Sequence, residues 1–267
     1  NAVAPAFYHD AVQATLGAVC DVRAEALNGL ARPVAATYTD HRRMLRETEL
    51  DAVYVAAGMD RHAALVLDCL EAGKHVVVDK AMCLSVAEAD AMIAAARRNE
   101  RMLAVFHARR RDGNFRAVKE IVHAGEIGQV FHIELTAGGY ARPRDWWYSR
   151  KALGGGAFYY WGPHAIDWVL DLVRSKILGV NGFYHKLVWQ DVDQEDQTRA
   201  ILRFENGCVA DITWSHIAAV GKPLWRILGT QGGIIDTGAG GNKGYQNEIE
   251  GPAGGTFQVV TVRDGKR

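Results

Sequence analysis

The feature that most constrains the fold of this chain is a regular alternation of short apolar runs and amphipathic stretches across residues 16–106. The apolar runs read LGAVC, AVYVAA, HVVV and LAVF, and the stretches between them include RHAALVLDCLEAG and SVAEADAMIAAARRNE. Strands that alternate with helices predict βαβ units, in which parallel strands share one sheet. We therefore expect a parallel-sheet α/β domain over residues 1–108.

Local signals at two helix ends agree with this pattern. Ser85 is followed three residues later by Glu88, which is the spacing of a capping box, so a helix should begin after Ser85. Gly73 follows the preceding helical stretch, at a position where a left-handed residue ends many helices.

The pattern changes after about Arg109. One amphipathic helix, FRAVKEIVHAGEIG, precedes a glycine-rich segment and several runs in which apolar and polar residues alternate. Two of these runs, QTRAILRF and CVADITWS, are joined by Glu205, Asn206 and Gly207, and Asn-Gly between alternating runs predicts a hairpin. We expect an α+β domain with an open, mostly antiparallel sheet over residues 109–267.

The charge balance limits the partners that this chain can bind. Its 31 basic and 31 acidic residues cancel, so no broad basic field exists to attract nucleic acid or an anionic membrane. The longest apolar runs are too short to span a bilayer, and the first residues show no signal-peptide pattern. We expect a soluble protein whose partner is a small neutral or weakly charged molecule.

The cysteines indicate the redox compartment. Cys20, Cys69, Cys83 and Cys208 are far apart, have apolar neighbours and form no CxxC pair. This spacing favours buried thiols over disulfides or a zinc site, and such thiols are typical of a reducing compartment. We therefore expect a cytoplasmic protein without a metal centre.

An acidic residue at a strand end indicates a dinucleotide site. Asp21 closes the run AVCD, and an acid that closes the second strand of a dinucleotide fold hydrogen-bonds the ribose hydroxyls. The glycine fingerprint should lie roughly 20 residues earlier, at or before residue 1, and the chain opens NAVAPAFYHD. Either the first strand and its glycine loop lie outside this numbering, which we favour, or the protein lacks them. Asp21 is equally suited to capping the helix that follows.

Three segments carry a resemblance to a known family. The segment LDAVYVAAGMDRHAALVLDCLEAGKHVVVDKAMCLSVAEADAMIAAA resembles DAVxIATPNxxHxxxxxxALxAGKHVxxEKPxxxxxxEAxxLxxxA of the Gfo/Idh/MocA oxidoreductases. The similarity continues through FHARRRDGNFRAVKEIVHAGEIGQV, and GGGAFYYWGPHAID resembles the family's GGGxLxDxGxHxxD. The resemblance implies a Rossmann-like domain, an NAD(P)-dependent dehydrogenase or reductase acting on a sugar, cyclitol or similar polyol, and a C-terminal sheet that mediates dimers or tetramers.

The resemblance also implies a set of cofactor-binding positions. Residues 57–59 stand where the family has TPN beside the nicotinamide, and residues 79–81 stand where it has EKP. With the acid at the end of AVCD, the expected cofactor-binding residues are Asp21, Arg23, Ala57, Gly58, Met59, His62, Asp79, Lys80 and Arg109. We expect NAD, with NADP as the alternative, because Asp21 would accept from a ribose diol and repel a 2′-phosphate.

Three side chains form the expected catalytic set: Lys80, Tyr160 and His164. Hydride transfer from an alcohol needs a group that takes the hydroxyl proton. The ordinary pKa of a tyrosine phenol, about 10, is too high for a good base, and a nearby ammonium such as that of Lys80 would lower it. His164 and Asp167 match the family pattern, whereas Tyr160 stands where the family has an aspartate. A tyrosine and a histidine on one helix face are also often only packing residues.

Pro163 affects how this set can be arranged. Proline removes an N–H and clashes within a helix, so a continuous helix through Pro163 would be kinked. If the regular helix begins near Gly162 with Pro163 in its first turn, only His164 and Asp167 share a face.

The expected substrate-binding residues are Trp147, Tyr148, Tyr160, His164 and Asp167. The aromatic members would form a platform for the apolar face of a sugar, although a core or interface role is equally consistent with them.

Two functions remain open from the sequence. The first is a dehydrogenase or reductase that acts on a carbohydrate-like hydroxyl or its ketone. The second is a non-catalytic relative that binds a dinucleotide or sugar or serves in an assembly. We also expect a homo-oligomer, because large residues such as Trp189, Trp214 and Trp225 would give the second sheet an uncovered apolar face.

Overall fold

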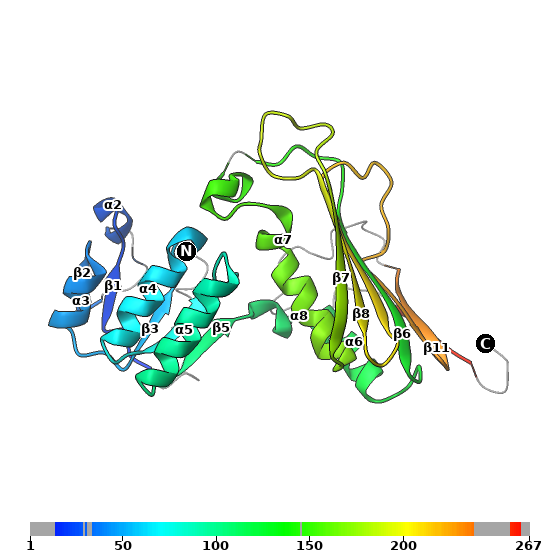
Figure 1. Ribbon diagram of the computed structural model, residues 1–267, viewed down its shortest axis with the longest axis horizontal. Helices are drawn as coiled ribbons and strands as arrows, with labels where there is room; N and C mark the ends of the chain where they lie inside the picture. Colours follow the sequence, from blue (N-terminus) through cyan, green and yellow to red (C-terminus); the bar gives the residue numbers. More distant parts are fainter. Residues whose placement is uncertain (1–13, 29, 31–33, 145, 238–256, 263–267) are drawn as a thin grey trace. The chain divides into compact units, whose positions relative to one another are not determined.

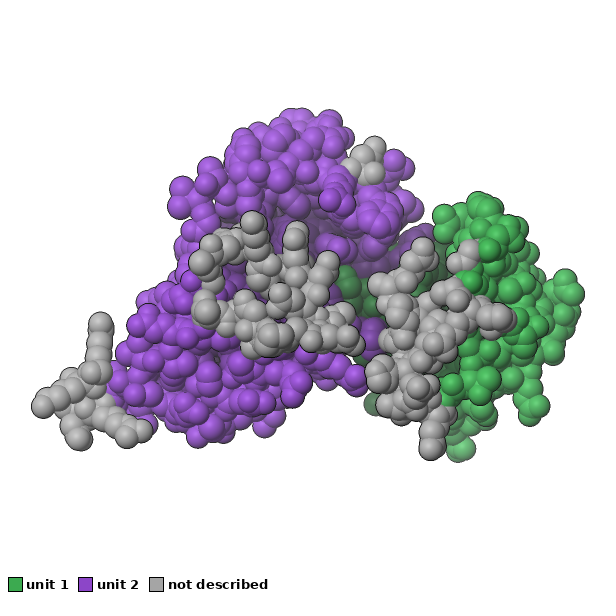
Figure 2. All heavy atoms as spheres, turned by 180° about the vertical axis from the view of Figure 1, so that it is seen from behind, with its two compact units in different colours: residues 1–57, 61–105 green, residues 58–60, 106–267 purple. Residues whose placement is uncertain are grey.

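The computed structural model describes residues 14–28, 30, 34–144, 146–237 and 257–262. The chain divides into two compact units, which Figure 2 colours separately: residues 1–57 with 61–105, and residues 58–60 with 106–267. The place expected for a first strand and its glycine loop, at or before residue 1, lies outside the described residues.

Parallel strands form the first unit. Strands β1 (Ala18–Cys20) and β2 (Ala36–Tyr38) pair in parallel. Strands β3 (Ala52–Val55), β4 (His75–Asp79) and β5 (Leu103–Phe106) form a second ladder in that order, with β3 parallel to β4. The helices are α2 (Ala24–Leu27), α3 (His41–Glu47), α4 (Met59–Glu71) and α5 (Val86–Arg98). The expected parallel-sheet domain is confirmed.

The helix ends of this unit follow the local signals. Ser85 caps α5 by accepting the N–H of Glu88, and the Glu88 carboxylate accepts the N–H of Ser85, which completes the capping box. Gly73 follows α4 with φ of 75°, a conformation that glycine adopts without strain. Buried apolar residues of α4, α5 and the central strand, among them Leu70, Met92 and Val76, form the core.

A seven-stranded sheet forms the second unit, in the order β12-β11-β10-β6-β9-β8-β7. Its strands are β6 (Val130–Gly138), β7 (Ile177–His185), β8 (Gln197–Phe204), β9 (Val209–Ser215), β10 (Trp225–Gly229), β11 (Gly232–Asp236) and β12 (Phe257–Thr261). The pairs are antiparallel except β6 with β9, so the expected mostly antiparallel sheet is confirmed. Gly207, with φ of 85°, turns the chain from β8 into β9, as the Asn-Gly signal predicts.

Helices cover one face of this sheet (Figure 1). They are α6 (Gly113–His123), α7 (Ala157–Tyr160) and α8 (Gly162–Val173), and the unit also contains the short helices η1 (Ala108–Arg111), η2 (Trp147–Ser149) and η3 (Lys151–Leu153). Between helices and sheet lies an aromatic core, in which Phe115 stacks on Trp168 at 5.4 Å and Trp168 lies 5.5 Å from Trp225. Full burial of such large side chains is a major source of stability.

The tryptophans that we expected on an uncovered face lie elsewhere, so that premise was wrong. Trp225 is fully buried in the core, and Trp214 packs against Trp161 of the helical layer at 5.1 Å. Trp189 belongs to the loop between β7 and β8. The face of the sheet away from the helices carries ion pairs, Arg199 with Asp211 and Arg226 with Glu134. A homo-oligomer remains a prediction, but the three tryptophans no longer support it.

Two further expectations concern the cysteines and the membrane. All four cysteines are unbridged, and burial raises the pKa of Cys69 to about 12 and that of Cys208 to about 11, so both are neutral thiols. Within the described ranges, no helix has the length and apolar character needed to cross a bilayer.

Candidate active site

Two loops meet at the carboxyl ends of neighbouring parallel strands in the first unit. Ala56 and Ala57 follow β3 and are exposed, and Lys80 follows β4 and is half-buried. Because β3 and β4 pair in register, with Val55 opposite Val78, the two loops leave the same edge of the sheet. Open α/β sheets bind their ligands at this edge.

The loop after β4 holds Lys80 through its backbone. The Lys80 N–H donates to Oδ1 of Asp79 at 2.8 Å, and the peptide bond between Lys80 and Ala81 is cis. Tyr54, on β3, lies near the same carboxylate: burial and the charge of Asp79 raise its pKa, so the phenol stays protonated. The sequence did not single out Tyr54, because a tyrosine inside an apolar strand has no distinguishing pattern.

His62 lies between these two loops. Its side chain, in the first turn of α4, is only 1% exposed. Nδ1 lies 2.8 Å from the carbonyl oxygen of Ala81, and Nε2 lies 3.1 Å from that of Ala57. The structure therefore places His62 against backbone carbonyls of both loops.

Asp21 stands at the end of β1, as expected. Its N–H donates to the carbonyl of Tyr38 at 3.1 Å, and its carboxylate accepts the N–H of Arg23 at 2.9 Å. Helix α2 begins after Arg23, so Asp21 binds the residue just before the helix. The Asp21 side chain is 35% exposed and the Arg23 side chain 68%, which leaves both accessible to a ligand.

In the second unit the glycine-rich segment contains two helices. Helix α7 ends at Tyr160, and α8 begins at Gly162 with Pro163 in its first turn. This confirms that the regular helix starts near Gly162, and it separates Tyr160 from His164 and Asp167. The glycines serve close backbone packing: a Cβ on Gly155 would lie 2.5 Å from the carbonyl oxygen of Arg150.

Tyr160 belongs to a cluster of aromatic rings with Trp146, Trp147 and Tyr148. Its ring stacks on that of Tyr148 with centroids 4.8 Å apart, and the Trp147 ring meets it edge-on at 6.3 Å. Trp146 lies 5.5 Å from Tyr148 and is 59% exposed. Burial, with the neighbouring Tyr160, raises the pKa of Tyr148, so this phenol is neutral. The structure thus brings Tyr160 together with the residues of the expected platform.

His164 has a second histidine beside it. It is 6% exposed, and its ring lies 6.3 Å from the ring of His107 in an edge-on arrangement. Nδ1 of His107 lies 3.9 Å from Oδ2 of Asp167. His107 directly precedes η1, so the start of this short helix and the first turns of α8 bring the two histidines and Asp167 together.

The three consecutive arginines of η1 are not equivalent. Arg110 binds Asp167 with two hydrogen bonds, of 2.7 Å from Nε and 2.6 Å from Nη2, and the Asp167 side chain is 11% exposed. Arg109, the expected ligand contact, pairs with Asp112 at 2.9 Å, and its carbonyl accepts from the Trp168 indole. The sequence presents this run as a solvated basic face, and pairing across 57 residues leaves no local signal.

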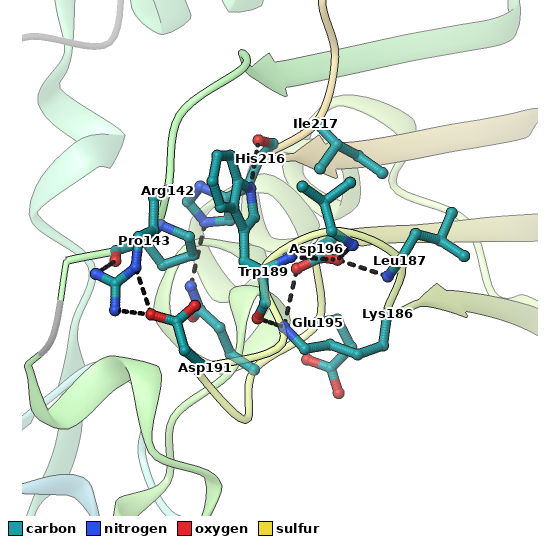
Figure 3. Close-up of polar contacts among 12 residues, drawn as sticks. Arg142, Pro143, Lys186, Leu187, Trp189, Asp191, Glu195, Asp196, His216 and Ile217 are labelled. Atoms are coloured by element: carbon teal, nitrogen blue, oxygen red, sulfur yellow. Dashed lines mark hydrogen bonds and ion pairs between the residues drawn. The ribbon is translucent and has the colours of Figure 1, made fainter.

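A buried carboxylate fixes the loop beside the glycine-rich segment. Asp196 is fully buried and accepts from the N–H groups of Leu187 and Val188, each at 2.6 Å, and from Lys186 Nζ at 2.9 Å (Figure 3). Burial alone would raise the pKa of Asp196, but the hydrogen bonds from Val188, Lys186 and Leu187 outweigh it and lower the pKa to about 2.

The same loop contacts the segment that precedes α7. The Lys151 N–H donates to Asp193 at 2.9 Å, and Lys151 Nζ pairs with Glu195 at 2.7 Å. A Cβ on Gly156 would lie 3.4 Å from the Glu195 carboxylate. The loop anchored by Asp196 therefore supports the turn that precedes α7, the helix that ends at Tyr160.

The expected catalytic residues fall in both units. Lys80 belongs to the first unit, and Tyr160 and His164 belong to the second. The joint action of the three side chains stays a prediction. Across the part of the chain that the structure describes, no group of histidine, cysteine and acidic side chains is arranged to hold a metal ion.

Two family models match most of the chain. Residues 1–107 match the model described as an oxidoreductase family with an NAD-binding Rossmann fold. Residues 115–235 match the GFO/IDH/MocA C-terminal domain.

Individual relatives agree with these matches. The chain is 29% identical over 228 residues to myo-inositol 2-dehydrogenase of Thermotoga maritima, which covers 83% of the chain and 67% of that protein. It is 28% identical over 189 residues to 1-carboxy-3-chloro-3,4-dihydroxycyclohexa-1,5-diene dehydrogenase of Comamonas testosteroni, which covers 70% of the chain and 47% of that protein. The solved structure of an NAD-binding protein from Listeria innocua superposes with a TM-score of 0.73 at 32% identity, covering 82% of this chain and 64% of that one. The chain spans about half the length of several curated relatives that it matches.

Proposed function

This chain belongs to the GFO/IDH/MocA family of NAD-binding oxidoreductases, and from that premise we propose that it transfers a hydride between a nicotinamide cofactor and a ring CH–OH group of a sugar or cyclitol, or the corresponding ketone. The observation that carries the proposal is the position of Lys80. It follows β4 at the ligand-binding edge of the domain that matches the NAD-binding family.

The first unit has residues that suit the cofactor. Asp21 presents a partly exposed carboxylate at the end of β1, which is the chemistry needed to accept from ribose hydroxyls. The neighbouring Arg23 guanidinium would reduce the repulsion of a 2′-phosphate, so the preference for NAD over NADP should be moderate. Ala57, Asp79 and Lys80 complete the proposed cofactor site of this unit, with His62 behind them, and Gly58, Met59 and Arg109 of the second unit are further candidates.

The proposed chemistry divides the work between a lysine and a histidine. When bound, the nicotinamide supplies the hydride-accepting ring. The Lys80 ammonium stabilises the negative charge that develops on the substrate oxygen as its proton leaves. His164 accepts that proton, because imidazole changes charge near neutral pH. Asp167, which Arg110 holds, lies beside His107, the histidine next to His164.

The aromatic cluster supports a cyclic substrate. Ring faces of Trp146, Trp147, Tyr148 and Tyr160 offer an apolar surface, and the C–H face of a six-membered ring packs well on such a surface. Two relatives are named for dehydrogenation of ring polyols or diols, which is the same substrate class. Tyr160 remains a candidate for the acid/base, although its stacking on Tyr148 equally supports a packing and binding role.

A screen tests the proposal. Cyclitols, sugars and cyclic diols are incubated with the protein and NAD, and NADH formation is followed by absorbance, while cofactor binding is measured separately by fluorescence titration. We expect at least one ring polyol or diol to be oxidised, and His164→Ala to lower kcat/KM by about 10²-fold. Cofactor binding without turnover of any alcohol or ketone would instead favour the non-catalytic relative.

A further inference from the structure

The position of His62 assigns it a task beyond contact with a ligand. The ring is 1% exposed, so neither nitrogen is directed into solvent. Nδ1 meets the Ala81 carbonyl at 2.8 Å, and Nε2 meets the Ala57 carbonyl at 3.1 Å. A carbonyl oxygen only accepts, so each contact requires an N–H on that nitrogen of the ring. The doubly protonated ring makes both hydrogen bonds at once, and a neutral ring makes one at a time.

The two carbonyls belong to the two loops of the proposed cofactor site. Ala57 directly precedes Gly58 at the end of the β3 loop, and Ala81 directly follows Lys80 at the end of β4. Since β3 and β4 are parallel neighbours, the ring bridges adjacent loops at one edge of the sheet. The Lys80 backbone is therefore held on both sides, by Asp79 before it and by His62 after it.

We infer that His62 is a positioning residue that sets the Lys80 segment and the end of the β3 loop at Ala57 relative to each other, through the contact of Nδ1 with Ala81 and that of Nε2 with Ala57. This inference rests on the proposed function, in which the lysine acts on the substrate and the loop lines the nicotinamide. The Nδ1 bond determines where the Lys80 segment lies, and the Nε2 bond determines where the β3 loop lies. Displacement of a reacting group by about 1 Å is enough to lower a rate by about 10²-fold.

Two conservative substitutions separate the two hydrogen bonds. The amide nitrogen of asparagine occupies nearly the place of Nδ1, and that of glutamine nearly the place of Nε2. His62→Asn should keep the bond to Ala81 and lose the bond to Ala57, and His62→Gln should do the reverse. His62→Leu removes both bonds, and the asparagine and glutamine variants carry the test if the leucine variant fails to fold.

Steady-state kinetics then read the two losses separately. His62→Asn should raise the KM for NAD by about tenfold or more with kcat within roughly threefold of wild type. His62→Gln should lower kcat by about tenfold or more while the KM for NAD stays near wild type. The control is His75→Asn, since His75 lies at the opposite end of β4 and accepts from the Met102 N–H, and its kinetics should match wild type.

Hydrogen–deuterium exchange tests the same inference without turnover. His62→Asn should speed exchange in peptides containing Ala57, and His62→Gln in peptides containing Ala81, with the rest of the chain unchanged. If wild type shows no activity but this exchange pattern appears, the proposed function fails and the positioning role stands. If the two variants change both loops equally, or neither, His62 is only a packing residue and the inference is overturned.

Discussion

Asp196→Asn should destabilise the second unit, because it removes a buried charge that several donors share. The Asp196 pKa falls from an ordinary value of 3.8 to about 2. At about 1.36 kcal/mol for each pKa unit, this difference corresponds to about 2 kcal/mol of folding free energy at neutral pH. The substitution also turns an amide N–H toward another donor, either Lys186 Nζ or the N–H of Leu187, and two donors cannot bond each other. The total loss of folding free energy should therefore reach about 3 kcal/mol.

The pH dependence of this contribution has a definite sign. A carboxyl group whose pKa is lowered in the folded state stabilises the fold above its unfolded pKa and loses that effect as pH falls through the folded pKa. The Asp196 contribution should therefore be complete above about pH 4 and vanish toward pH 2. Other carboxylates titrate in this range, so the informative quantity is the difference between wild type and variant.

Urea unfolding of the whole chain, followed by tryptophan fluorescence, measures this difference. The control is Asp191→Asn, in the same loop. This substitution removes the charge of an exposed carboxylate that pairs with Arg142, so stability should change little. If Asp196→Asn is as stable as wild type at pH 7, or if the difference does not shrink as pH falls from 4 to 2, the assigned role of Asp196 is wrong.

Three further predictions concern the site. Tyr160→Phe should leave kcat/KM within roughly threefold of wild type if the ring only packs on Tyr148, and should lower it by about 10²-fold or more if the phenol handles the proton, as measured by steady-state kinetics. Arg110→Ala should cost about 2 kcal/mol in urea unfolding, because it leaves the Asp167 carboxylate without its main donor, and adding Asp167→Asn should recover part of that loss; a fully additive double variant would contradict the pairing. Asp21→Ser should lower the preference for NAD over NADP by about tenfold in fluorescence titrations, and an unchanged ratio would exclude Asp21 as the ribose acceptor.

The elements that the sequence predicted depend on neighbouring residues. The capping box at Ser85, the left-handed Gly73 and the Asn206-Gly207 turn each act over a few residues, so their patterns are visible before folding. The interruption at Pro163 is equally local, because proline alone excludes a continuous helix.

The features that the sequence missed depend on distant contacts. Arg110 meets Asp167 only after η1 and α8 have packed, and the run of three arginines hides which of them is paired. The alternation of residues in β9 and β10 shows that Trp214 and Trp225 lie on the same face of the sheet as the residues paired with them. It does not show which face of the sheet the helices cover. His62 matched a family position, yet its two carbonyl partners emerge only once β3 and β4 lie side by side.

The most direct test of the proposed oxidoreductase is kcat/KM for Lys80→Ala beside Lys74→Ala. The two lysines lie at opposite ends of β4, so the pair separates loss of the reacting charge from general loss of charge. With a ring polyol that wild type oxidises, Lys80→Ala should lower kcat/KM by about 10²-fold or more, and Lys74→Ala should stay within roughly twofold. If kcat/KM of the Lys80→Ala variant equals that of wild type, the proposed role of Lys80 in hydride transfer is contradicted.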